Sequence, residues 1–473
     1  MKIIKDSIIP TTVSAGNLFN NVHLKTFFSG NWPILSILVG YLLVAFSIGP
    51  YYNGDVAWEL DAVRGVIKYG LPYTNGFYLM DQPPLGFYIQ ALLFKGFGLS
   101  INNGTFLVTM FGLGSLILLY LIGKTVYNKT TGYFAALLFA FTPWQLIMSR
   151  TMLIDVPCLF FSLLSLFVGI NAIKLDSFKL LVASGFIFAA AFNTKLFAAF
   201  MLIPLLGYFL YYGPKKLKRI ILWVVAFSIP VLFFSYLWYQ VITGLGLFSI
   251  FGHTDFNVDI PTGFVPTYFF VANFLTSYGL GWFFIDAVVL SFIVYLIQRR
   301  LPRNFLVFDI ICIAVIVCTL SINTILGAAL DLKAPFLNAF KYDFQTLPFF
   351  SLLASSLISK SLVMFNSAKT RLKLDKIFFN AIAVVGVVLV VLSIFYNMRF
   401  ANLFSNANYL IFRVEPGVDI GYSLFNSAPT SGNIAQIAIQ YIGFAIALSG
   451  LFWISRSRIS SIPNFFIKEK KKN

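Results

Sequence analysis

Charged side chains are scarce in this chain: Asp, Glu, Lys and Arg make up 11% of its 473 residues, whereas hydrophobic residues make up 59%. Histidine is scarcer still, with two residues, and the sequence has neither a His/Cys cluster of metal-binding spacing nor a glycine-rich phosphate-binding loop. A water-soluble core does not need so large an apolar fraction, so the composition excludes an ordinary soluble domain. It predicts an all-α polytopic membrane protein.

Cysteine is equally rare, and the three residues, Cys158, Cys312 and Cys318, all fall within apolar runs. Cys312 and Cys318 lie on one predicted helix, where their side chains point to different faces. No disulfide is therefore predicted, and the cysteines do not indicate a redox compartment. The first part of the chain lacks a short apolar run followed by a small-residue cleavage site, so we expect the first hydrophobic segment to be a retained span.

Apolar runs long enough to cross a bilayer recur along the chain, since a span needs roughly 20 mainly apolar residues. Such runs predict about 12 transmembrane helices, within a range of about 11–13. They lie at 33–50, 104–123, 131–148, 155–173, 178–193, 195–212, 219–240, 278–298, 305–327, 345–363, 377–397 and 434–454. The run at 85–99 is apolar but short, and counting it as a span would invert the side of every later loop.

The distribution of Lys and Arg decides how the short run is interpreted, because short cytoplasmic loops collect cationic residues. With 85–99 left out, the two termini and the loops on their side hold 25 of the 34 Lys and Arg residues. The formal charge of +17 then follows from membrane topology and does not indicate a nucleic-acid partner. Residues 85–99 are predicted to form a helix on the external leaflet, and Pro84 suits its first turn.

This topology places the protein in the cell membrane as a multi-pass protein, with loops and span ends exposed on the external face. It divides the chain into a cytoplasmic N-terminal segment at 1–32, a transmembrane core at 33–365 with an external loop at 51–99, further spans at 366–454 with an external loop at 398–433, and a basic cytoplasmic tail at 455–473. Because there is no sizeable soluble domain, any chemistry must be assembled at the membrane surface.

The external loop 51–99 concentrates acid in an otherwise apolar chain, at Asp55, Glu59, Asp61 and Asp81. Asp55 follows "GPYYNG", whose glycines and proline favour a turn. Asp81 comes shortly before the rigid pair Pro83-Pro84. Each of these two aspartates is either a turn cap or a functional carboxylate.

Residues 56–69 have the spacing of an amphipathic helix that lies along the membrane interface, with an apolar stripe of Val56, Leu60, Val63 and Ile67. Its charged residues fall off this stripe and are predicted to form a solvated face with weak ion pairs: Glu59, Asp61, Arg64 and Lys68.

A carboxylate at a membrane surface acts as a general base if it reaches a hydroxyl nucleophile. A second carboxylate nearby can chelate a cation, orient the acceptor or raise the pKa of the first, so a divalent metal cofactor is left open. Asp155 is a further candidate, because it opens a predicted span beside Arg150 in "SRTMLIDVPCLFF". Helix capping is the alternative role for Asp155.

Cationic residues are few on the face predicted to be external, so each of them is a candidate for a specific role. Lys195 in "AFNTKLFAAF" and Lys341 in "AFKYDFQTLPFF" are candidates for binding a phosphate at the membrane boundary. Snorkelling of the ammonium group to the lipid headgroups is the alternative.

Successive blocks of this chain resemble those of the integral-membrane C-type glycosyltransferases (GT-C fold): "GDVAWELDAVRGVIKYGLPY", "MDQPPLGFYIQALLFKGFG", "SRTMLIDVPCLFFSLLSLF" and "KYDFQTLPFFSLLAS". The resemblance covers 33–365 and is nearest to the aminoarabinose transferase and protein O-mannosyltransferase group. It implies a bundle of spans with external juxtamembrane helices in the first loop. It also implies a catalytic aspartate in that loop and a lipid-linked sugar that enters from the outer leaflet.

The resemblance also implies roles for single residues. Asp55 falls at the catalytic aspartate, Asp81 at the acidic position before Pro-Pro, Asp155 at the second acidic block, and Lys341-Tyr342 near the usual Arg/His-Tyr pair. Two positions depart from the family pattern, since Val56 replaces a common Glu and Gln82 replaces Lys or His. Glutamine can donate a hydrogen bond to phosphate or sugar but brings no charge, so the cation would come from Lys195, Arg150 or Lys341.

These observations predict a glycosyltransferase that moves a monosaccharide from a polyprenyl-phosphate donor to an acceptor hydroxyl at the external face, with inversion and with Asp55 as the base. The sugar is left open, and so is the acceptor, which is a lipid, a glycan or a protein. A lipid or glycan transporter and a non-catalytic membrane assembly subunit are the alternatives. Transporters usually have ionisable residues deep within spans, and here, apart from Asp155 at the first residue of its span, only Asp286 and Asp309 are acidic residues within predicted spans.

Overall fold

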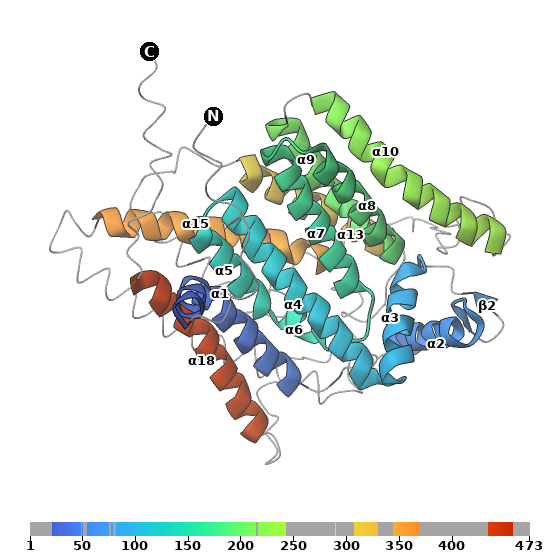
Figure 1. Cartoon of the computed structure of the whole chain (residues 1–473), viewed down its shortest axis with the longest axis horizontal. Coiled ribbons are helices and arrows are strands. Elements are labelled where there is room, and N and C mark those ends of the chain that lie inside the picture. The colour runs from blue at the N-terminus through green and yellow to red at the C-terminus, as the bar shows by residue number, and fades with distance from the viewer. Residues whose placement is uncertain are drawn as a thin grey trace.

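The computed structural model describes residues 21–48, 50, 54–74, 77–78, 82–213, 216–242, 289, 307–329, 344–368 and 434–456. These residues form a bundle of helices with one short two-stranded ladder at its edge (Figure 1). The all-α membrane fold predicted from the sequence is confirmed.

The first half of the bundle begins with α1 (Asn21–Ser47) and α2 (Gly54–Tyr69), followed by the strands β1 (Tyr73–Thr74) and β2 (Phe77–Tyr78). It continues with α3 (Leu85–Phe97), α4 (Ile101–Val126), α5 (Lys129–Ala140), α6 (Pro143–Ser149), α7 (Asp155–Lys174) and α8 (Phe178–Thr194). The two strands pair antiparallel, with Tyr73 opposite Tyr78 and Thr74 opposite Phe77.

The second half begins with a 3₁₀ helix, η2 (Leu196–Met201), which leads into α9 (Leu202–Tyr212). It continues with α10 (Lys216–Ser235), the π-helix η3 (Tyr236–Ile242), α13 (Val307–Ala329), the 3₁₀ helix η5 (Phe344–Thr346), α15 (Leu347–Ala368) and α18 (Ile434–Arg456).

Three helices in the described part are long and apolar enough to cross a membrane, at Ile101–Val126, Asp155–Lys174 and Leu217–Ile242. Shorter apolar helices of 10–17 residues accompany them. The predicted spans at 278–298 and 377–397 lie outside the described residues apart from residue 289, and every other predicted span overlaps a helix. The total of about 12 spans stays a prediction.

The short apolar run after Pro84 forms α3, a helix of 13 residues. At about 1.5 Å per residue such a helix is about 20 Å long, which is less than the roughly 30 Å thickness of the hydrocarbon core. The length of α3 therefore fits the prediction that this run lies at the membrane surface and does not span it.

One predicted span is broken in the structure. The run 131–148 was expected to be a single helix, but α5 ends at Ala140 and α6 begins at Pro143. Proline disfavours the helical conformation of the residue before it, and Thr142 is extended, with φ −67° and ψ 136°. The Thr142 hydroxyl accepts a hydrogen bond from the backbone amide of Gln145 and caps α6.

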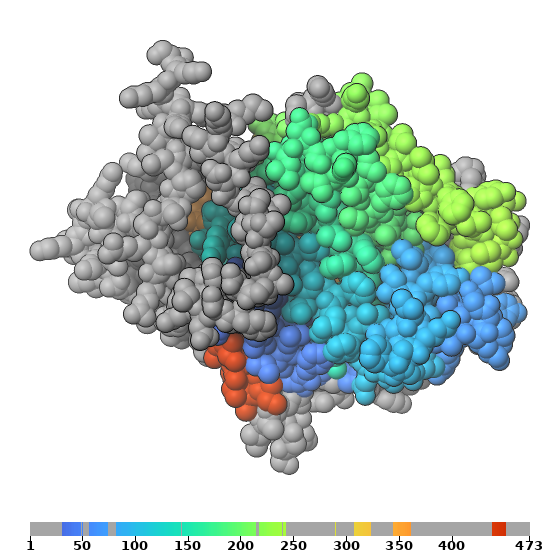
Figure 2. Space-filling view, viewed as in Figure 1, coloured from blue at the N-terminus to red at the C-terminus, as the bar shows by residue number. Residues whose placement is uncertain are grey.

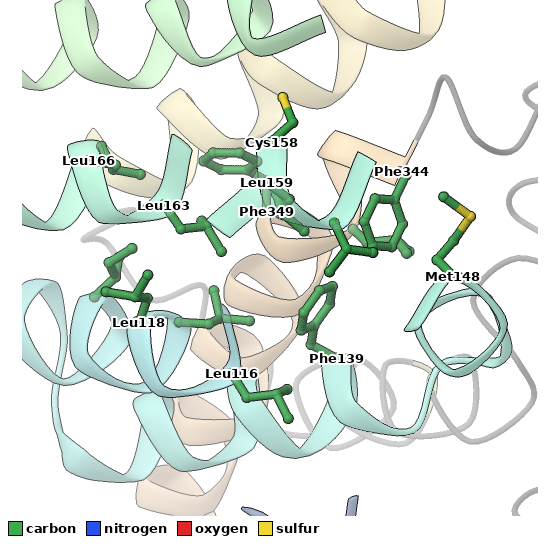
Figure 3. Packing of buried hydrophobic residues seen from close by; sticks show 14 of the residues in the cluster. Leu116, Leu118, Phe139, Met148, Cys158, Leu159, Leu163, Leu166, Phe344 and Phe349 are labelled. Carbon is green, nitrogen blue, oxygen red and sulfur yellow. The ribbon is translucent and has the colours of Figure 1, made fainter. Parts of the chain in front are cut away.

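The apolar core lies where α4, α5 and α7 meet the start of α15. Figure 3 shows buried side chains from each of these elements, and from η5, around it: Leu116, Leu118, Phe139, Leu159, Leu163, Phe344 and Phe349. The first and last helices of the described part, α1 and α18, lie side by side outside this core (Figure 1). A Cβ atom at Gly40 would lie 2.2 Å from the carbonyl oxygen of Gly443, so only small residues allow this close approach.

The side chains of α10 form an apolar face on the outside of the bundle. Figure 2 shows α10 at the rim of the described part, above α2 and α3. Its exposed residues include Leu217, Ile221, Val225, Ile229, Leu232 and Phe233. A contiguous apolar surface of this kind marks an interaction site, and for a membrane protein the surrounding lipid is the natural partner.

A buried polar cluster joins three helices at the end of the bundle predicted to be cytoplasmic. Asp309 of α13 is fully buried, and its carboxylate accepts hydrogen bonds from the Tyr127 hydroxyl and the Lys360 ammonium, each at 2.7 Å. Asp309 is therefore bound to protein groups, and it links the end of α4 to α13 and α15.

Replacing Asp309 by alanine is expected to lower the free energy of unfolding by about 3 kcal/mol, because it leaves the Lys360 cation partly buried without its carboxylate. Unfolding in detergent micelles measures this loss. The matched control is Asp61→Ala, which removes an exposed ion pair with Arg64 and should cost less than about 1 kcal/mol. Equal losses in the two variants would contradict a stabilising role for the buried cluster.

Candidate functional site

Helix α2 carries the first predicted catalytic residue. Asp55 lies in the first turn of α2, and its side chain is outside the described part of the structure. The apolar stripe predicted for this helix is buried at Val56, Leu60 and Val63. A helix is thus present over the expected residues 56–69, and its position on the external face stays a prediction.

The charged residues of α2 do not all lie in solvent as predicted. Asp61 and Arg64 form an exposed ion pair at 2.7 Å, as expected, and Lys68 is exposed. Glu59, however, is buried with 8% of its surface exposed, so the prediction of a solvated side chain is wrong for this residue. Its Oε2 atom accepts a hydrogen bond of 3.1 Å from the Ile154 backbone amide, because the segment before α7 covers this side of α2.

The start of α3 packs against the same segment. A Cβ atom at Gly86 would lie 2.5 Å from Cγ2 of Ile154 and 3.3 Å from Cγ2 of Thr194, so the absence of a side chain lets the helix approach both. Gln82 is half-buried just before this helix, and Asp81 lies outside the described residues. The segment around Pro83-Pro84, the Pro-Pro block, is thereby held beside Ile154 and Thr194, the residues that precede Asp155 and Lys195.

Asp155 and Lys195, predicted separately, form a buried ion pair. The Lys195 ammonium lies 2.8 Å from both Oδ1 and Oδ2 of Asp155, and the two side chains are 5% and 2% exposed respectively. Asp155 is the first residue of α7, and Lys195 lies in the extended break between α8 and η2, with φ −159° and ψ 138°. A local helix break therefore presents the cation to the helix start.

The pair excludes one alternative role for each residue, and their roles in catalysis stay predictions. The N-cap of α7 is Ile154, and the Asp155 carboxylate binds Lys195, so the capping interpretation of Asp155 is wrong. Lys195 is buried, so the snorkelling interpretation is wrong as well. Removing either partner leaves a charge buried without compensation, which makes the pair structurally sensitive.

Arg150 is held by the protein at the end of α6. Its Nε donates to the carbonyl oxygen of Ile48 at 2.9 Å, its Nη1 donates to the Thr109 hydroxyl at 3.4 Å, and the guanidinium lies 5.3 Å from the centre of the Phe46 ring. Burial lowers the pKa of the Arg150 guanidinium from its ordinary value. Arg150 thus fastens α6 to α1 and α4, and a role toward phosphate stays a prediction.

A polar network beside Arg150 was not predicted from the sequence. The Tyr41 hydroxyl donates to the Ser149 hydroxyl at 2.5 Å, and the side-chain amide of Gln145 donates to the Ser149 hydroxyl at 3.1 Å. The Thr109 hydroxyl contacts the Ser149 carbonyl oxygen at 2.8 Å. In the sequence, this network was indicated only by polar residues scattered along apolar helices. In the structure, it holds the segment that leads to Asp155.

The π-helix η3 also reaches this region, through Trp238. Trp238 is buried and packs against Leu71, which follows α2, and against Leu196, which follows Lys195. π-helical turns occur frequently at functional sites, because the extra residue redirects side chains. Nothing in the sequence around Trp238 indicated the π-helix.

Two buried glutamine amides were also missed from the sequence. Gln90 on α3 and Gln345 in η5 are 1% and 2% exposed, and their side-chain N and O atoms have no hydrogen-bond partner among the described residues. Gln345 belongs to the block of the predicted residues Lys341 and Tyr342, which lie outside the described part. The described residues contain no group of three or more His, Cys, Asp and Glu side chains that could hold a metal ion.

Most of the chain is similar in structure to a protein of known structure. The crystal structure of ArnT from Cupriavidus metallidurans bound to undecaprenyl phosphate matches with a TM-score of 0.54 and 13% identity, covering 92% of this chain and 79% of that chain. At this identity the likeness shows the fold. The fold is that of the integral-membrane C-type glycosyltransferases, and the resemblance seen in the sequence blocks is confirmed.

Sequence comparisons match one part of the chain to mannosyltransferases. Residues 81–239 match the family model of dolichyl-phosphate-mannose-protein mannosyltransferase. "Putative mannosyltransferase YkcB" of Bacillus subtilis (strain 168) is 29% identical over 185 residues, which are 39% of this chain and 26% of that protein. "Putative mannosyltransferase YycA" of the same strain is 31% identical over 177 residues, which are 35% of this chain and 26% of that protein. The matched part thus spans about a quarter of these curated relatives.

Proposed function

We propose that this protein is a membrane glycosyltransferase that moves a monosaccharide from a polyprenyl-phosphate donor to an acceptor hydroxyl at the external face. The observation that carries the proposal is the junction of three sequence blocks. Glu59 of the acidic block binds the amide before Asp155, Gly86 of the Pro-Pro block packs beside it, and Lys195 pairs with Asp155. The family match over 81–239 supports the same chemistry.

The proposed reaction is a direct displacement at the anomeric carbon. The acceptor oxygen forms a bond to that carbon while the bond from the carbon to the phosphate oxygen breaks. Asp55 takes the proton of the acceptor hydroxyl as general base. Polyprenyl phosphate leaves with the bonding electrons, and one displacement without a covalent sugar intermediate inverts the anomeric configuration.

The leaving phosphate gains negative charge, so a fixed cation beside it stabilises the transition state. Lys195 is the proposed cation, because its buried ammonium lies at this junction, 2.8 Å from both carboxylate oxygens of Asp155. Asp155 then orients Lys195. Gln82, Arg150, Lys341 and Tyr342 are proposed to contact the donor, and Asp81 to orient the acceptor.

The transporter alternative is less well supported. Asp309, a described acidic residue within the predicted span 305–327, is bound to Tyr127 and Lys360, so its carboxylate is committed to protein contacts. The assembly-subunit alternative needs only the acidic surface of α2, and it does not explain a buried ion pair between α7 and the break before η2.

Incubating the purified protein with a labelled polyprenyl-phosphate sugar and a mixture of acceptors separates the three functions. Release of free polyprenyl phosphate that depends on acceptor supports transfer. Movement of the intact donor across a vesicle membrane without its cleavage would support transport. Binding partners retained without cleavage or movement would support an assembly role.

A further inference from the structure

Glu59 makes a contact that the proposed reaction has not used. Its carboxylate is buried on α2 and accepts a hydrogen bond of 3.1 Å from the backbone amide of Ile154, the residue directly before Asp155. The sequence separation between the two residues is 95. The contact therefore joins the external helix to the start of a core helix.

The contact supplies a hydrogen-bond acceptor for the N-terminus of α7 that the helix itself does not provide. In a capping box, a Glu or Gln at the third helical position reaches back to the backbone amide of the N-cap residue. In α7 the N-cap is Ile154 and the third helical position is Pro157, which cannot make this bond. Glu59 supplies the acceptor from another helix, and its negative charge suits the positive end of the α7 dipole.

The position of Glu59 on α2 gives this contact a consequence for the site. Asp55 lies four residues earlier, and residues four apart are neighbours on one helix face. Asp155 follows Ile154 and holds Lys195. Glu59 thus joins the helix that carries the proposed base to the start of α7, and the Asp155–Lys195 pair extends this link to the proposed phosphate cation.

Burying a carboxylate among apolar side chains is costly unless hydrogen bonds compensate it. Val56, Leu60 and Val63 of the same helix are also buried, so Glu59 lies on a part of α2 that is covered by protein. We propose that Glu59 is a positioning residue that sets the separation between Asp55 and the Asp155–Lys195 pair. This inference rests on the proposed function for its catalytic consequence, whereas the link between α2 and α7 can be tested without it.

Hydrogen exchange at the start of α7 tests the link. In Glu59→Ala the Ile154 amide loses its acceptor, so exchange of a peptide covering 151–158 should be faster than in the parent by roughly tenfold or more. Glu59→Gln keeps an amide oxygen as acceptor and should exchange like the parent. The control is Asp61→Ala, which changes an exposed acid two residues further along α2. Unchanged exchange in folded Glu59→Ala would overturn the link, whatever the activity.

Turnover tests the positioning role. A misplacement of about 1 Å can cost roughly 100-fold in rate, so Glu59→Ala should lower kcat by about 10–100-fold while donor Kd changes little, and Glu59→Gln should recover most of kcat. Faster exchange with parental kcat would overturn the positioning role, as would equal losses of kcat in Glu59→Ala and Glu59→Gln. If Glu59→Ala does not fold, Glu59→Asp, which is one methylene shorter, takes its place in both measurements. A parent protein without acceptor-dependent transfer would refute the proposed function, and hydrogen exchange would still decide the link.

Discussion

Asp55→Asn is expected to lower turnover by roughly 10²–10⁴-fold, the range that loss of a general base produces. Asparagine keeps the size of the side chain and most of its hydrogen bonds but cannot accept the proton. Donor binding should change much less, because other groups hold the phosphate and the lipid. Initial rates with a labelled polyprenyl-phosphate sugar, together with donor Kd, measure the two effects separately.

Two control variants make this result specific. Asp61→Asn changes an exposed residue of the same helix and should have nearly parental turnover. Asp81→Asn should lie between the two, because Asp81 is proposed to orient the acceptor and not to abstract the proton. A folded Asp55→Asn protein with parental turnover would refute the general-base mechanism.

Lys195→Met is expected to affect both stability and activity. It leaves the Asp155 carboxylate buried without its cation, which should lower the free energy of unfolding by about 3–5 kcal/mol. It also removes the cation proposed for the leaving phosphate, so turnover should fall by roughly 10²–10³-fold. Without the ion pair in view, the sequence predicted a change in donor use with folding intact, and the buried pair corrects that expectation.

A double variant separates these two effects. Replacing both partners of a buried ion pair by apolar residues is often neutral, so Lys195→Met combined with Asp155→Leu should recover most of the lost stability. Turnover should stay low, because the cation is still missing. Lys68→Met, at an exposed position on α2, is the control for loss of a positive charge. Recovery of turnover together with stability would mean that the phosphate is held elsewhere, and Arg150 would be the next candidate.

The sequence predicted the helices well, because long apolar runs mark the residues that are buried in lipid or in the protein core. The apolar stripe of α2 and the short helix α3 follow from periodicity and run length alone. The break at Thr142 was also marked in the sequence, by Pro143, but an apolar run without charges concealed it. Local patterns of this kind predicted the helices, whereas the resemblance supplied the glycosyltransferase fold.

The contacts that assemble the site could not be predicted in the same way. Glu59 lies off the apolar stripe of α2, and periodicity alone places such a residue in solvent. Its burial depends on the segment before α7, which is distant in sequence. The pairing of Asp155 with Lys195 likewise depends on how the end of α8 meets the start of α7, and propensity does not specify such a distance.

Sided transfer in proteoliposomes tests most directly whether the site lies at the external junction of α2 and α7. A short-chain, water-soluble polyprenyl-phosphate sugar is added to vesicles whose protein orientation has been determined, from one side at a time, with acceptor on the same side. The proposed function predicts acceptor-dependent release of polyprenyl phosphate when both substrates meet the external face, and loss of this release in Asp55→Asn. Equal release from the cytoplasmic side, or undiminished release in Asp55→Asn, would contradict it.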